Sequence, residues 1–97
     1  MENTVKSPAE IREEFVNDLA MMVRHSMSNA PIKDSWLSMA IAHAELLFNF
    51  NEVSPDDKNF LVDMIHKMRG SANIVTNYFR YVACMWLVYG WVLTMNT

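Results

Sequence analysis

Glycine and proline are scarce in this chain, and their positions constrain its fold more than any other sequence feature. They occupy five of 97 positions, and Pro8, Pro31, Pro55 and Gly70 fall where helices would begin or end. Between them apolar residues recur at intervals of three and four, which is the spacing of amphipathic helices. The long apolar runs lack the turn signals that would separate strands. The sequence therefore predicts a single all-α domain over residues 1–97.

Four helices are expected, and the segments between them are short. We predict, after a flexible N-terminus at 1–6, helices at about residues 8–28, 33–50, 55–69 and 72–95. Short links favour antiparallel neighbours. The expected architecture is a compact four-helix bundle or a pair of helical hairpins. The C-terminal helix is apolar over most of its surface, so it is expected to be central.

Helix ends are marked by residues that satisfy free backbone groups. In residues 7–10, Ser-Pro-Ala-Glu, the serine can cap a helix, the proline suits the first turn and the glutamate can complete a capping box. Residues 54–57, Ser-Pro-Asp-Asp, give a second start of the same kind. Gly70 suits a left-handed C-terminal cap, and Ser71 is the expected cap of the fourth helix.

The C-terminal segment is unusually apolar. No charged side chain follows Arg80, and the run at 81–97 contains Trp86, Tyr89 and Trp91. A helix of this length covers only about 25 Å. Because the hydrocarbon core of a bilayer is about 30 Å thick, a membrane span is not favoured. The segment is then either the central helix of the monomer's own core or an interface with another protein chain.

Small and weakly polar residues along the fourth predicted helix favour the interface. Thr76, Ala83 and Gly90 recur every seven residues, and Leu87 and Thr94 lie at the alternate heptad positions. Small residues let two helix backbones approach closely. A glycine inside a helix costs about 1 kcal/mol relative to alanine, which a close helix contact would explain. We therefore predict self-association through these five residues, with a dimer favoured.

Net charge restricts the kind of partner. The chain carries 8 basic and 11 acidic residues and has a net charge of −3. This balance is unlike the basic surfaces that bind nucleic acid directly. Glu10, Glu13, Glu14 and Asp18 share one side of the first predicted helix. These four residues form either a solvated face or a docking surface for a basic partner protein.

Three polar residues stand where apolar side chains are expected. His43 lies opposite the polar stripe of the second predicted helix, so it must find a hydrogen-bond partner. Arg12 projects near the apolar side of the first helix, and Arg80 is the only charged residue of the fourth. His43 is expected either to be satisfied within the protein or to have a ligand or switch role. The arginines are expected either to reach the surface along their apolar stems or to contact an anion, a partner carboxylate or a neighbouring helix terminus.

Catalytic and metal-binding motifs are missing from the sequence. Cys84 lies in an apolar run without an adjacent base, and such surroundings raise the pKa of a thiol. There is no Glu-x-x-His pair of the kind that binds a di-iron centre, and no glycine-rich phosphate loop. The sequence therefore predicts no enzymatic activity, no cofactor and no metal site.

The expected function is that of a protein-interaction module that occupies a partner's surface. Size, acidity and the lack of catalytic motifs suggest, by analogy, a virus- or phage-type inhibitor of host machinery or defence. Two alternatives stay open: a membrane-associated small regulator that uses residues 81–97, and an oligomer that sequesters a small anionic ligand. The polar N-terminus lacks the apolar core of a secretory signal, so a cytoplasmic location is expected.

Overall fold

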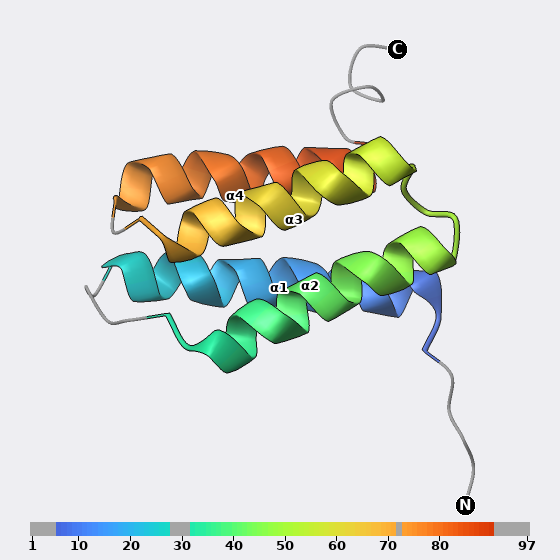
Figure 1. The fold of residues 1–97 in the computed structure, drawn as a ribbon, viewed down its shortest axis with the longest axis horizontal. Coiled ribbons are helices and arrows are strands. Elements are labelled where there is room, and N and C mark those ends of the chain that lie inside the picture. Colours follow the sequence, from blue (N-terminus) through green and yellow to red (C-terminus); the bar gives the residue numbers. More distant parts are fainter. Residues whose placement is uncertain (1–5, 28–31, 72, 91–97) are drawn as a thin grey trace, which may run out of the picture.

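The computed structural model describes residues 6–27, 32–71 and 73–90. These residues form four helices, which are α1 (Pro8–Met27), α2 (Asp34–Asn49), α3 (Pro55–Arg69) and α4 (Ile74–Tyr89). Successive helices run antiparallel, and α4 packs beside both α3 and α1 (Figure 1). The short links between the helices produce this arrangement, because they leave little chain for any other crossing. The predicted all-α bundle of four helices is confirmed.

Two helix starts are capped as the sequence predicts. Ser7 Oγ accepts a hydrogen bond from the backbone N–H of Glu10 at 3.2 Å, and the Glu10 carboxylate accepts one from the N–H of Ser7 at 2.8 Å. Ser54 Oγ accepts from the backbone N–H of Asp57 at 3.1 Å. These side chains satisfy N–H groups that the first helical turn leaves free. The predicted starts of α1 and α3 are therefore confirmed.

The link between α3 and α4 differs from the sequence prediction. Gly70 ends α3 with φ −84°, so it does not adopt the left-handed conformation predicted for it. Asn73, rather than Ser71, caps α4, because the Asn73 side chain accepts a hydrogen bond from the N–H of Thr76 at 3.0 Å. Ser71 Oγ instead accepts from the N–H of Asn73 at 3.1 Å and so stabilises the link before the helix.

Gly90 is the glycine that adopts the left-handed conformation, with φ +66°. Its N–H donates to the carbonyl of Trp86 at 2.7 Å and closes the last turn of α4. The helix thus ends at Tyr89, whereas the sequence predicts that it continues to about residue 95. Glycine takes this backbone conformation without the steric penalty of a Cβ atom, which makes it a helix terminator. Residues 1–5, 28–31, 72 and 91–97 lie outside the described residues.

The core is centred on α1. The side chains of Phe15, Leu19 and Met22 on this helix are fully buried, and α1 contacts each of the other three helices. The other helices add mainly Ala40, Ala44, Leu47, Leu61, Ile65 and Met68. The central position that the sequence predicts for the C-terminal helix therefore belongs to α1. The reason is that α4 is apolar on nearly every side, but a helix at the corner of a bundle can turn only part of its surface to the core.

Candidate functional site

Four of the large apolar side chains that are exposed among the described residues lie on α4, including the three most exposed ones. Phe79 is 66% exposed, Val75 60%, Tyr78 52% and Trp86 49%. With Val82, which is partly buried, these residues form a surface that we call the α4 outer face. Isolated exposed apolar residues are normal on proteins, but a contiguous group of aromatic rings is typical of binding surfaces.

Helical spacing explains why this surface faces outward. Asn77 and Cys84 are the buried residues of α4, and they lie seven positions apart on the side toward the core. Phe79, Val82 and Trp86 follow intervals of three and four on the opposite side. The rings of Tyr78 and Phe79 lie next to each other, with centroids 6.3 Å apart. The outer face is thus a continuous stripe along about three helical turns.

The α4 outer face is also uncharged. Arg80 is the only charged residue of α4, and its guanidinium is engaged elsewhere. It donates to the side-chain oxygen of Asn77 at 3.0 Å and to the carbonyl of Lys67 at 3.3 Å. A cation near the last carbonyls of a helix is favourable, so Arg80 stabilises the C-terminal end of α3. Contact with a neighbouring helix terminus is one of the alternatives that the sequence leaves open for Arg80.

The self-association seam predicted from the sequence lies beside the α4 outer face. Thr76 is exposed and Ala83 is partly buried, and both border the aromatic stripe. Leu87 packs against the core, Gly90 ends the helix, and Thr94 lies outside the described residues. The structure thus brings two of the five predicted residues to the edge of the exposed face. The heptad repeat of large apolar residues beside them is the signal that the sequence reasoning missed.

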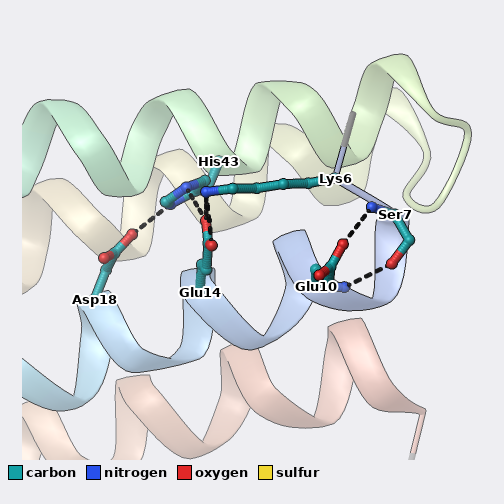
Figure 2. A network of polar contacts seen from close by, with 6 residues as sticks. All are labelled: Lys6, Ser7, Glu10, Glu14, Asp18 and His43. Atoms are coloured by element: carbon teal, nitrogen blue, oxygen red, sulfur yellow. Dashed lines mark hydrogen bonds and ion pairs between the residues drawn. The ribbon is translucent and has the colours of Figure 1, made fainter. Parts of the chain in front are cut away.

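A polar network links α1 to α2 around His43. The Nδ1 atom of His43 lies 2.6 Å from the Asp18 carboxylate, and its Nε2 atom lies 3.1 Å from the Glu14 carboxylate (Figure 2). Lys6 Nζ approaches the other oxygen of Glu14 at 2.7 Å. Each ring nitrogen of His43 thus lies within hydrogen-bonding distance of a carboxylate of α1. A satisfied interhelical histidine is one of the two alternatives that the sequence leaves open.

This network engages most of the acidic residues that the sequence assigns to partner docking. Glu10 caps α1, while Glu14 and Asp18 contact His43, and Glu13 is exposed. The hydrogen bond from Lys6 lowers the pKa of Glu14, whereas burial raises the pKa of Asp18. Glu14 and Asp18 thus already have partners within the chain, whereas Glu10 and Glu13 are exposed.

An open hollow of about 410 Å³ lies next to this network. Its lining consists of Lys6, Glu14, Asn17, Asp18, Met39 and His43. The charged groups in it are already paired with one another. Among the residues that the structure describes, no group of three or more histidine, cysteine, aspartate or glutamate side chains is placed to hold a metal ion.

Arg12 and Cys84 complete the set of residues singled out from the sequence. Arg12 forms an ion pair with Glu52, and its guanidinium lies 5.6 Å from the centre of the Tyr89 ring. Arg12, His43 and Arg80 therefore contact separate partners and do not converge on one ligand site. Cys84 is fully buried, and this burial raises the pKa of its thiol to about 12. A thiol in such surroundings is not a reactive nucleophile.

Two further findings bear on function. In the described part of the chain, none of the helices combines the length and the apolar character needed to cross a membrane. Comparison with protein families, curated proteins and solved structures finds no match to this chain.

Proposed function

We propose that this protein is a non-enzymatic interaction module whose α4 outer face binds a further protein chain. The observation that carries this proposal is the exposure of Phe79 and Trp86, at 66% and 49%, on one uncharged side of a helix. Tryptophan and tyrosine are enriched among the residues that contribute most to protein–protein binding. The α4 outer face supplies both, arranged on a rigid helix that the bundle holds in place.

The apolar area on this face is large enough to support binding. Phe79 and Trp86 each leave roughly 120 Å² of side-chain surface in water, given the usual area of aromatic residues. At ~25 cal/mol per Å², covering each ring contributes about 3 kcal/mol before the entropic cost of association. Two such residues side by side can therefore act as the centre of an interface.

The contacts of the polar residues favour this face over the other predicted sites. Glu14 and Asp18 already contact His43, so docking through the acidic side of α1 would have to break these contacts. Arg12 and Arg80 are likewise engaged with groups of the same chain, which gives little support to the sequestering of an anionic ligand. As an inhibitor of host machinery, such a module would act by steric blockade of a partner's surface.

Comparative affinity capture tests the proposal. The full-length chain and its Phe79→Gln variant are immobilised and exposed to lysate of the source cells. Phe60→Gln is the matched control, because Phe60 is an exposed phenylalanine on α3 that receives the same substitution. We expect one protein of the lysate to be retained by the wild type and by Phe60→Gln but not by Phe79→Gln. In calorimetric titration, the purified form of that protein should bind the same two chains and not the third. Equal retention by all three chains would contradict the proposal.

A further inference from the structure

We infer that the partner of the α4 outer face is the same face of a second copy of this chain, which gives a two-fold symmetric dimer. This inference rests on the proposed function, because it also takes the face to be covered by protein. It goes further by naming the occupant. Its three supports are the spacing of the apolar residues, the absence of charge and the area available.

The spacing of the apolar residues matches a helix–helix seam. Val75, Phe79, Val82 and Trp86 are separated by four, three and four residues, and Tyr89 continues the series three residues later. This alternation keeps side chains on the side of a helix that faces a partner helix in coiled-coil packing. In a two-fold dimer both copies use the same patch. The side chains of the stripe on one copy therefore pack into the spaces between the side chains of the same stripe on the other copy.

The charge of the face suits a copy of itself. The chain has a net charge of −3, yet the α4 outer face has no charged residue. Two copies can therefore meet there without placing like charges opposite each other, and the face offers no charge to attract a strongly acidic or basic partner. Thr76 and Ala83 border the stripe, and their small side chains allow the two helix backbones to approach closely.

The area of the face is sufficient for a modest dimer. Tyr78, Phe79 and Trp86 together leave roughly 350 Å² uncovered, at the usual areas of aromatic side chains. With Val75 and the side chains beside it, the face reaches about 600 Å², which is one partner's share of the smaller specific interfaces. Buried area alone does not set affinity, so we place this small interface at the weak end of specific complexes, with a dissociation constant of about 1 μM.

Sedimentation velocity of the full-length chain tests the inference across protein concentrations from about 0.1 to 100 μM, which bracket that constant. For the wild type we expect a change from a species of 11.2 kDa to one of twice that mass. Phe79→Gln should weaken association roughly 100-fold, since a symmetric dimer contains each substitution twice. Phe60→Gln, the same change on α3, should associate like the wild type. A wild type that stays monomeric, or a dimer that Phe79→Gln leaves unchanged, would overturn the inference.

Further arms of the experiment identify a different occupant. A monomeric wild type that still captures another protein in a Phe79-dependent manner would end the dimer inference and leave the proposed function standing. A monomer that begins to dimerise when residues 91–97 are deleted would show that these residues cover the face, which would overturn the inference. Co-sedimentation of a monomeric wild type, but not of Phe79→Gln, with phosphatidylcholine–phosphatidylserine vesicles would overturn both proposals.

Discussion

Replacing the buried Asn77 by alanine should destabilise the bundle more than any other single change to a polar residue of α4. The side-chain nitrogen of Asn77 donates to Ser26 Oγ at 2.7 Å, to the carbonyl of Ser71 at 3.0 Å and to the carbonyl of Met68 at 3.2 Å. Its oxygen accepts a hydrogen bond from Arg80 at 3.0 Å. One fully buried amide thus connects α1, the end of α3 and α4.

The magnitude follows from the groups that lose their partner. Alanine at position 77 removes the donor to the Ser71 carbonyl. The Met68 carbonyl keeps a hydrogen bond from the N–H of Ser71 at 3.3 Å, and Ser26 keeps its own hydrogen bond to the carbonyl of Met22 at 3.2 Å. Leaving a buried polar group unpaired costs about 1–3 kcal/mol, and the missing side-chain volume adds a cavity term. We therefore expect a loss of about 3 kcal/mol in the free energy of unfolding. For a domain of this size that corresponds to a fall in Tm of roughly 12–24 °C.

Urea denaturation followed by circular dichroism measures this loss, at one fixed protein concentration for all variants. Asn73→Ala is the matched control, because Asn73 is also an asparagine of this region but only caps α4 from an exposed position. The control should lose about 1 kcal/mol. Asn77→Asp should lose at least as much as Asn77→Ala, since it places a carboxylate against the carbonyl oxygens of Met68 and Ser71. A loss below about 1 kcal/mol for Asn77→Ala would refute the assigned network.

Three other predictions concern a thiol, an ion pair and a helix end. Cys84 should resist alkylation in the folded protein at neutral pH, because burial raises its thiol pKa to about 12, and rapid labelling without unfolding would contradict this. Lys6→Met should raise the pKa of Glu14 toward its ordinary value of 4.5 in an NMR titration. The contribution of the Lys6–Glu14 pair to stability is fully present above pH 4.5 and is lost as the pH falls through the lowered pKa of the folded state. An unchanged titration of Glu14 would argue against the contact. Gly90→Ala should lower the free energy of unfolding by about 1 kcal/mol. Backbone strain alone causes this loss, because a Cβ at Gly90 meets no atom within 4 Å. A substitution that leaves thermal denaturation unchanged would contradict the left-handed cap.

Local signals in the sequence predicted local features of the fold. Ser7 and Ser54 cap α1 and α3 because the bonded groups lie three residues apart, and such a spacing is visible in the sequence. The same reasoning failed between α3 and α4, where Ser71 and Asn73 both qualify as caps. Choosing between them requires the position at which the helix begins, which packing against the rest of the bundle decides.

Contacts between helices were less accessible from the sequence. The pattern around His43 showed that it needs a polar partner, but not that Asp18 and Glu14 of α1 supply it. That choice depends on the rotation of two helices about their axes, and spacing within one helix does not fix it. The exposure of Phe79 was missed for a related reason. The sequence did not reveal which side of α4 the bundle leaves uncovered.

Fluorine NMR of the full-length chain tests the central claim, that the α4 outer face is covered by protein, most directly. 4-Fluorophenylalanine is placed at position 79 in one sample and at position 60 in another, and the solvent isotope shift of each fluorine is followed as the protein concentration rises. We expect the isotope shift at position 79 to fall as the face becomes covered, while the shift at position 60 stays constant. An isotope shift at position 79 that keeps its low-concentration value at every concentration, and with any captured partner, would contradict the claim.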